Sequence, residues 1–439
     1  MLEAKAMRVV GIDGRNLVLQ RGTGVATYAR NLADNLHEMG WGVSTVYGAP
    51  LASRLSPLLR EVLFFDYFGG EQREKKLGGI ARDVLKEMAA TPFGFRAMDI
   101  PQSGKVETRK FVDRLPRKAA IFNVCNLFNA ARRYFKCFGK FLEISLPETP
   151  DVMHWTYPLP VRVAGAANIY TIHDLVPLRL PYTTLDNKKY YYQLIKQCLE
   201  TADHVCTVSE RSKTDIVDLF GTPEHRISNS YQSVDVSSWA ESKDQQVAES
   251  EVEGIFGLEP QSYFLFFGAI EPKKNVGRLV EAFLSAHLDA RLVIVGSLAW
   301  KSDEEMKLVN EILKGRPELR RRISVFDYVP RAFLISLIRS AKAVVFPSLY
   351  EGFGLPVLEA MQLGTPTLCS TGGALPEIAA DASLCVDPYD VASMAGGLRM
   401  LDQDRDLRRQ LKEKGIERAR FFEPDAYKAR LSTMYSQVL

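Results

Sequence analysis

The sequence lacks the features of a membrane-spanning or secreted protein. It has 439 residues but no run of about 18 apolar residues that could form a transmembrane helix. Its six cysteines form no CxxC pair and no Cys/His metal spacing, which excludes a zinc module and favours a reducing compartment. The first residues turn polar too early for a signal peptide. We therefore expect a cytoplasmic protein, either soluble or attached peripherally to the inner face of the plasma membrane.

The sequence also lacks an excess of one charge and the common cofactor motifs. With 56 basic and 53 acidic residues its net charge is +3, and this balance gives no reason to expect nucleic-acid binding. The glycines of "RGTGVATY" (Arg21–Tyr28) do not form GxGxxG, so nicotinamide binding is weakly supported. The strings "DQD" and "DRD" (Asp402–Asp406) lie in a charged helical stretch typical of solvated surface. We expect neither a metal nor a cofactor.

What the sequence does contain is an alternation of short apolar runs and amphipathic stretches. This alternation predicts parallel strands covered by helices, an α/β architecture. The length exceeds what one hydrophobic core usually holds and favours two domains. We assign residues 1–235 to a first Rossmann-like domain, 240–415 to a second, and 416–439 to a C-terminal helix that returns to the first. Residues from about 50 to 150 break the alternation and indicate a basic, mostly helical insertion.

The stretch "SLYEGFGLPVLEA" follows the apolar run "KAVVFPS" and combines glycines with two carboxylates. In open α/β sheets, ligands bind beyond the carboxyl ends of the strands and against helix N-termini. Gly352 and Gly354 let backbone N–H groups approach an anion, while Glu351 and Glu359 can accept hydrogen bonds from sugar hydroxyls. The pattern suits a sugar nucleotide, although an ordinary strand-to-helix turn would have the same spacing.

Two further constellations lie at the ends of predicted strands. "FGAIEPKKN" ends the first strand of the second half with a lysine pair, Lys273 and Lys274, which could meet a diphosphate or simply face solvent. "YTIHDLVPL" places His173 and Asp174 after a buried strand, where a structural and a catalytic role are both open. The glycines of "RGTG", before a predicted helix, offer a second contact for an anion.

Together these motifs resemble the retaining GT-B glycosyltransferases of family 4 (glycosyl transferases group 1). Glu351 and Glu359 match the family's E-x7-E motif with "GFGLP" between them. "GTGVATYARNL", "IHDL", "TVSERSK" and "GAIEPKKN" match in order and spacing, over nearly the whole chain apart from residues 50–150. The resemblance implies two Rossmann-like domains with parallel sheets facing across a cleft. The acceptor would bind the first domain and a nucleotide-sugar donor the second.

The resemblance also implies roles for individual residues. Glu351 would hold hydroxyls of the donor sugar, and Glu359 would hold those of the ribose. His173 would contact the sugar near the reacting carbon, Asp174 would orient that loop, and Lys274 would bind phosphate. The other donor contacts would come from Gly22, Thr23, Gly24, Lys273, Gly352, Phe353, Gly354 and Leu355.

The activity implied by the resemblance is sugar transfer with retention of configuration, without a metal, by front-face attack. The chain departs from many family members in having Ala269 in place of an arginine, and Lys273 could supply that charge. The "EPKKN" form is similar to mannosyl- and rhamnosyltransferases of surface-polysaccharide and lipopolysaccharide assembly. This similarity favours a GDP-sugar donor, with a UDP-sugar next, and a glycan or lipid-linked acceptor. A GT-B sugar-nucleotide epimerase and a catalytically silent nucleotide-sugar-binding subunit are the alternatives.

Residues 117–141, "RKAAIFNVCNLFNAARRYFKCFGKF", interleave aromatic side chains with arginine and lysine. Such a composition is typical of a segment that lies on an anionic membrane. A helix packed on the first domain with its basic side in water would have the same composition. Peripheral membrane contact through this segment is therefore a hypothesis that the sequence raises and leaves open.

Overall fold

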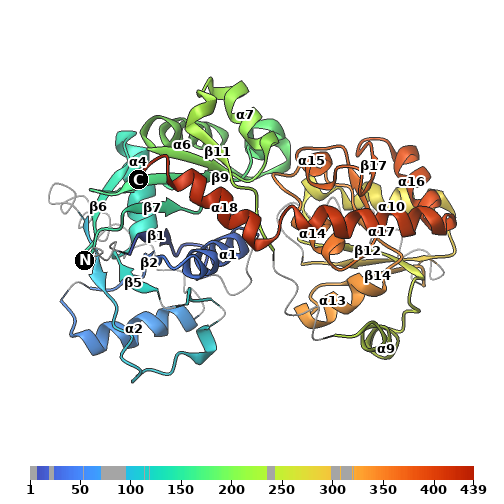
Figure 1. The fold of residues 1–439 in the computed structure, drawn as a ribbon, viewed down its shortest axis with the longest axis horizontal. Coiled ribbons are helices and arrows are strands. Elements are labelled where there is room, and N and C mark those ends of the chain that lie inside the picture. Colours follow the sequence, from blue (N-terminus) through green and yellow to red (C-terminus); the bar gives the residue numbers. More distant parts are fainter. Residues whose placement is uncertain are drawn as a thin grey trace, which may run out of the picture.

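The protein forms two lobes, each built on a parallel β-sheet, in a computed structural model (Figure 1). The structure describes residues 7–18, 24–52, 54–70, 95–112, 114–117, 119–234, 243–297, 307, 319 and 321–439. Strands such as Tyr263–Phe267, with all five residues buried, read as continuous apolar runs because helices cover both faces of a parallel sheet. The predicted α/β fold with parallel sheets is confirmed.

The N-terminal lobe contains an eight-stranded sheet in the order β11-β10-β9-β7-β1-β2-β5-β4 and a three-stranded sheet in the order β3-β6-β8. All strand pairs are parallel except β4 with β5. The strands are β1 (Val9–Asp13), β2 (Gly42–Tyr47), β3 (Phe95–Arg96), β4 (Met98–Asp99), β5 (Ala120–Asn123), β6 (Leu142–Ser145), β7 (Val152–Trp155), β8 (Val161–Val163), β9 (Ala167–Ile172), β10 (His204–Thr207) and β11 (Ile227–Asn229). The α-helices are α1 (Gly24–Glu38), α2 (Pro57–Gly69), α4 (Leu127–Phe138), α5 (Val176–Arg179), α6 (Lys188–Thr201) and α7 (Glu210–Phe220).

The C-terminal lobe contains a six-stranded parallel sheet in the order β14-β13-β12-β15-β16-β17. Its strands are β12 (Tyr263–Phe267), β13 (Arg291–Val295), β14 (Ile323–Phe326), β15 (Ala343–Phe346), β16 (Thr367–Ser370) and β17 (Leu384–Val386). Its helices are α9 (Gln245–Phe256), α10 (Val276–Ala286), α13 (Arg331–Ser340), α14 (Leu355–Gln362), α15 (Leu375–Ala379), α16 (Val391–Gln403) and α17 (Arg405–Arg420). The amphipathic stretch "DEEMKLVNEILKG", which predicts a further helix, lies outside the described residues except for Lys307.

The interpretation of residues 50–150 as a mostly helical insertion is wrong for its second half. Strand β5 pairs in parallel with β2, and β4 then pairs with β5, so this segment extends the main sheet of the lobe. The predicted membrane segment 117–141 likewise consists of β5 and helix α4. A four-residue strand carries too little periodicity to be distinguished from a loop, and the strand is specified by its neighbour in the sheet.

The last helix, α18 (Pro424–Tyr435), lies on the N-terminal lobe although the helix before it belongs to the C-terminal lobe (Figure 1). Its Tyr435 packs on Trp41 with ring centroids 5.3 Å apart. The Tyr435 hydroxyl lies 2.6 Å from Nδ1 of His154, a residue of β7 that is fully buried. The chain therefore passes between the lobes twice, once after Val234 and once between α17 and α18.

An aromatic cluster marks the second of these passages. Tyr231 of the N-terminal lobe packs edge-on against Phe421 and Phe422, with centroid distances of 5.4 and 5.5 Å. Phe422 also packs edge-on against Phe353, at 5.6 Å, and the Arg430 guanidinium lies 4.2 Å from the Phe421 ring. We call Tyr231, Phe353, Phe421 and Phe422 the hinge cluster.

Acid is expected to destabilise the fold through His154. Burial lowers the pKa of this imidazole to about 3, whereas an unfolded histidine titrates near 6.5. Between these two values the unfolded chain binds a proton that the folded chain excludes. The free energy of unfolding should therefore fall as the pH is lowered below about 6.5, by up to about 1.4 kcal/mol per pH unit for this residue. Urea titrations at pH 7, 6 and 5 measure the slope.

The control for this prediction is His154→Gln, which keeps polar atoms near Tyr435 but does not titrate. Because burial also lowers the pKa of His204, to about 4, the variant should retain part of the dependence. The variant's slope should be shallower than that of the native chain by about 1.4 kcal/mol per pH unit. Identical slopes for the two proteins would contradict the assignment.

Candidate active site

The C-terminal lobe places the predicted donor residues at the point where its strand order reverses. From the centre of the sheet, β12, β13 and β14 follow one another toward one edge, and β15, β16 and β17 follow one another toward the other edge. Lys273 and Lys274 lie in a short 3₁₀ helix (Pro272–Lys274) beyond β12, and Glu351 follows β15. Ligands of open α/β sheets bind at such a switch point, beyond the carboxyl ends of the strands.

The two lysines converge on the Glu351 carboxylate. Nζ of Lys274 lies 2.5 Å from Oε1, and Nζ of Lys273 lies 3.8 Å from Oε2. The backbone joins the two loops as well, because the Leu349 N–H donates to the Lys273 carbonyl at 2.7 Å. These contacts bring the lysine pair to a carboxylate that lies 77 residues after Lys274 along the chain.

The ion cluster is buried, and its pairing favours the charged forms of Glu351 and Lys273. Burial by itself would raise the pKa of Glu351, but the two lysines outweigh it and hold the pKa below its ordinary value. Burial would likewise lower the pKa of Lys273, but Glu351, Asp174 and Glu271 outweigh it and raise that pKa. A charged carboxylate accepts hydrogen bonds only, which suits hydroxyl groups of a sugar.

Helix α14 points its N-terminus at the same place. Gly354 precedes it with φ of 111°, a conformation that favours glycine, and Pro356 occupies the first turn. Among hydrogen bonds between described residues, none uses the N–H of Phe353, Gly354 or Leu355. Free N–H groups at the positive end of a helix form a site for an anion.

Glu359 lies in α14 and is paired, which sequence reasoning did not foresee. Its carboxylate lies 3.3 Å from Nη2 of Arg331, at the start of α13. Burial raises the pKa of Glu359 and Arg331 opposes that rise. Arg331 follows the loop beyond β14, so its place at the carboxyl end of a strand was the signal that could have identified it.

His173 comes from the N-terminal lobe and is neutral. Its Nε2 lies 2.9 Å from the carbonyl oxygen of Thr156, and since a carbonyl only accepts, Nε2 carries the hydrogen. Burial lowers the pKa of the ring, while the bond to Thr156 and the nearby Asp174 oppose that change. Nδ1, which has no hydrogen bond to any described residue, is therefore an acceptor rather than an acid.

Asp13 and Thr156 support His173 and were missed by sequence reasoning. Asp13 is the last residue of β1 and Thr156 follows β7, and these two strands flank the switch point of the N-terminal sheet. The Asp13 carboxylate accepts from the Thr156 N–H at 2.6 Å and from its hydroxyl at 2.8 Å. Burial raises the pKa of Asp13 against these bonds. The aspartate in "GIDGR" ends a buried strand and His173 directly follows one, so the same signal was present.

The lobes touch at the predicted residues. A Cβ added to Gly352 would lie 2.4 Å from the His173 carbonyl oxygen and 2.9 Å from Cβ of Asp174, so only glycine permits this approach. A Cβ on Gly24, the first residue of α1, would lie 3.5 Å from Leu355. The N-termini of α1 and α14 thus lie next to each other. Gly22 and Thr23 lie outside the described residues.

Helix α7 joins the two halves of this site. Its buried Asp215 accepts from Arg179 at 2.5 Å and from the hydroxyl of Tyr350, the residue before Glu351. The Glu377 carboxylate, from the C-terminal lobe, accepts from the first two N–H groups of α7 at 2.7 and 3.0 Å. The hydroxyl of Ser212, also in α7, donates to the His173 carbonyl at 2.7 Å. One helix therefore contacts both His173 and the residue next to Glu351.

Comparison with known proteins identifies the class. Among solved structures, Anabaena HepE in complex with UDP and glucose superposes with a TM-score of 0.64 over 98% of this chain and 99% of that chain, at 14% identity. Such neighbours are GT-B glycosyltransferases with two Rossmann-like domains, and the predicted fold is confirmed. The sequence matches the family model "Glycosyl transferases group 1" over residues 251–418 and the family model "Glycosyltransferase Family 4" over residues 105–238.

The similarity extends to sequence. The O-antigen chain mannosyltransferase B of Escherichia coli is 32% identical over 274 residues, which are 60% of this chain and 68% of the relative. The serotype-specific mannosyltransferase WbdA of Escherichia coli is 27% identical over 278 residues, 61% of this chain but only 33% of that protein. The chain belongs to glycosyltransferase family 4.

Proposed function

We propose that this chain is a retaining, metal-independent hexosyltransferase that moves mannose or a related sugar from a nucleotide-sugar donor to a glycan or lipid-linked acceptor. The observation that carries the proposal is the buried Lys273–Lys274–Glu351 cluster, which faces His173 across the contact between the lobes. A cation pair beside free helix N–H groups suits a diphosphate, and a charged carboxylate suits sugar hydroxyls.

In this proposal the diphosphate lies between the N-termini of α1 and α14. Lys274 and Lys273 neutralise its charge, Glu351 accepts from hydroxyls of the donor sugar, and Glu359 accepts from the ribose. His173, with its hydrogen on Nε2, accepts from the sugar through Nδ1 and does not act as an acid. Asp13 and Thr156 hold its ring, and Asp174 caps the start of α5 through the Val176 N–H at 3.1 Å.

The reaction then needs no protein nucleophile. The bond between the anomeric carbon and the phosphate oxygen breaks, and the acceptor oxygen bonds to the same carbon on the same face. The acceptor proton passes to an oxygen of the departing nucleoside diphosphate. The protein contributes by stabilising the charge that grows on the diphosphate and by positioning the two substrates.

The names of the relatives support the choice of sugar and pathway. One relative is named as an O-antigen chain mannosyltransferase and another as a serotype-specific mannosyltransferase. We therefore propose mannose from a GDP-sugar, with a UDP-sugar as the second choice, and a role in lipopolysaccharide or surface-polysaccharide synthesis. HepE binds UDP, so the experiment below also includes UDP, the nucleotide of the second proposed donor.

The proposed location is the cytoplasm, with peripheral contact at the inner face of the plasma membrane. No helix in the described ranges is long and apolar enough to span a bilayer. The contact would use the 117–141 segment, where Phe138 at the end of α4 is 54% exposed and Lys136 and Lys140 are exposed beside it. Flotation with acidic and with neutral liposomes tests this contact.

A thermal-shift series tests the donor. GDP should raise the melting temperature more than UDP or dTDP at equal concentration, because a ligand that binds only the folded chain stabilises it. At 100 times its Kd the ligand adds about 2.7 kcal/mol to the free energy of unfolding. Equal shifts for all three nucleotides would remove the GDP preference. Transfer and hydrolysis assays with GDP-mannose then separate a transferase from an epimerase or a silent subunit.

A further inference from the structure

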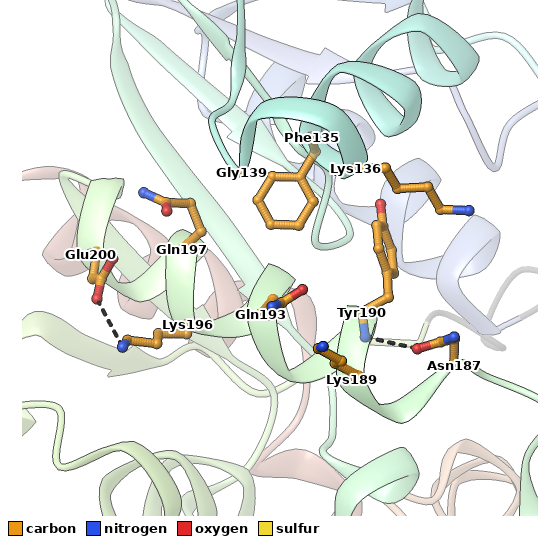
Figure 2. A pocket seen from close by; sticks show the side chains of 10 residues that line it. All are labelled: Phe135, Lys136, Gly139, Asn187, Lys189, Tyr190, Gln193, Lys196, Gln197 and Glu200. Carbon is orange, nitrogen blue, oxygen red and sulfur yellow. Dashed lines mark hydrogen bonds and ion pairs between the residues drawn. The ribbon is translucent and has the colours of Figure 1, made fainter.

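A pocket of about 490 Å³ lies between helices α4 and α6 of the N-terminal lobe, and none of the predicted donor residues lines it (Figure 2). Phe135 and Lys136 of α4 and Lys189, Tyr190 and Lys196 of α6 are among the residues that line it. The volume is within the range of small-molecule sites. The proposed reaction assigns no role to this pocket.

The pocket carries an excess of positive charge. It is lined by three lysines and one carboxylate, and that carboxylate, Glu200, lies 3.8 Å from Lys196 on the same helix. No ion pair between described residues involves Lys136 or Lys189. The first turn of α6 contains Lys188 and Lys189 and no acidic residue, so positive side chains stand at the positive end of the helix dipole. A bound anion would relieve this repulsion.

An aromatic ring holds two cations at the rim. The Arg132 guanidinium and the Lys136 ammonium lie 5.8 and 5.7 Å from the centroid of Tyr190. Phe135 packs edge-on against the same ring at 5.6 Å. Cation–π contacts position these side chains without neutralising them, so their charge remains available to a ligand.

The positive charge continues from the pocket toward the active site. Phe128, Arg132 and Lys136 follow one another at intervals of four residues and share one face of α4. Arg15, directly beyond the switch point of the N-terminal sheet, lies 5.7 Å from the Phe128 ring. We call Arg15, Arg132 and Lys136 the basic row. From Phe128 to Lys136 helix α4 advances by eight residues, a length of about 12 Å.

From this geometry we propose that the pocket binds the phosphate group of an acceptor whose accepting hydroxyl lies at the other end of the molecule. The ligand class is a glycan joined to a lipid through a diphosphate. Lysine ammonium groups meet the phosphate oxygens, and the side-chain amides of Gln193 and Gln197 can bond to the first sugar. The inference rests on the proposed transferase function and identifies which part of the acceptor the N-terminal lobe recognises.

Calorimetry with the full chain tests the pocket directly. The probes are farnesyl diphosphate and inorganic pyrophosphate, each added with GDP in excess to occupy the donor site. The Lys136→Ala/Lys189→Ala variant should bind farnesyl diphosphate at least about tenfold more weakly than the native chain, because two phosphate contacts are lost. The control, Lys105→Ala/Lys412→Ala, removes the same charge from other exposed positions and should bind as the native chain does.

The other outcomes of this experiment distinguish a pocket for phosphate from a pocket for a lipid-linked diphosphate, and both from results that contradict the proposal. If the variant loses affinity for pyrophosphate and for farnesyl diphosphate alike, the pocket recognises the phosphate itself. If it loses affinity for farnesyl diphosphate alone, the pocket recognises the lipid-linked form. Either result supports the proposal. The variant could instead bind farnesyl diphosphate as the native chain does but no longer bind phosphatidylglycerol vesicles. This result would identify the surface as a membrane-binding patch and overturn the proposal. Unchanged binding of every probe would overturn it too. Because binding needs no turnover, a chain without transferase activity would leave this test intact.

Discussion

Replacing Lys274 by alanine is expected to lower kcat by about 100- to 1000-fold, a loss of about 2.7–4 kcal/mol of transition-state stabilisation. Its ammonium lies 2.5 Å from Glu351 in a buried site, where an interaction with a charged group is stronger than in water. In the proposed reaction the same ammonium meets the charge that grows on the diphosphate. Without it, the one cation within 4 Å of Glu351 among the described residues is Lys273, at 3.8 Å, so the charged form of the carboxylate is stabilised less.

Lys342→Ala is the matched control. Lys342 belongs to the same lobe, its side chain is 15% exposed against 13% for Lys274, and it also lies 2.5 Å from a carboxylate, Asp402. Its loss should lower stability and leave kcat nearly unchanged. Steady-state rates and melting curves of the two variants separate an effect on chemistry from an effect on folding. Native turnover in Lys274→Ala would remove the central assignment of the site.

Replacing Gly352 by alanine should lower kcat/KM by at least about 100-fold without unfolding either lobe. The added methyl group would lie 2.4 Å from the His173 carbonyl oxygen, so the lobes must separate at this point. A displacement of about 1 Å between reacting groups can cost about 100-fold in rate. Affinity for the free nucleotide should persist, since its proposed contacts lie mostly within the C-terminal lobe.

Gly254→Ala provides the comparison for this variant. Gly254 lies in α9, and a Cβ there would meet no atom within 4 Å. Alanine should stabilise this helix by up to about 1 kcal/mol and leave the rate unchanged. Gly352→Ala should therefore keep its calorimetric affinity for GDP while its initial rate falls, and Gly254→Ala should keep both. A Gly352→Ala enzyme with native kcat/KM would show that the lobes need not meet here during turnover.

The fold and much of the candidate site could be predicted because strand ends are visible in the sequence. Lys273, Lys274 and Glu351 follow buried apolar runs, and parallel strands bring their carboxyl ends to one edge of a sheet. The same reasoning would have identified Asp13, which ends the first strand.

Other features depend on contacts between distant segments and leave no local pattern. Glu377 caps α7 from 167 residues away, and nothing in "TGGALPEI" indicates that partner. Strand β5 has four residues, and its pairing with β2 determines its conformation. The pairing of Arg331 with Glu359 likewise depends on how two helices of the C-terminal lobe are placed.

The hinge cluster connects the donor loop to the passage of the chain between the lobes. Phe353 is part of the E-x7-E stretch, and its ring packs on Phe422, which packs on Tyr231 of the opposite lobe. In the proposed reaction the donor contacts the backbone of Phe353, and it would therefore act on rings that bridge the two lobes. If it prefers one angle tenfold, it shifts that equilibrium by about 1.4 kcal/mol, and loading of the donor becomes a signal that prepares the acceptor surface.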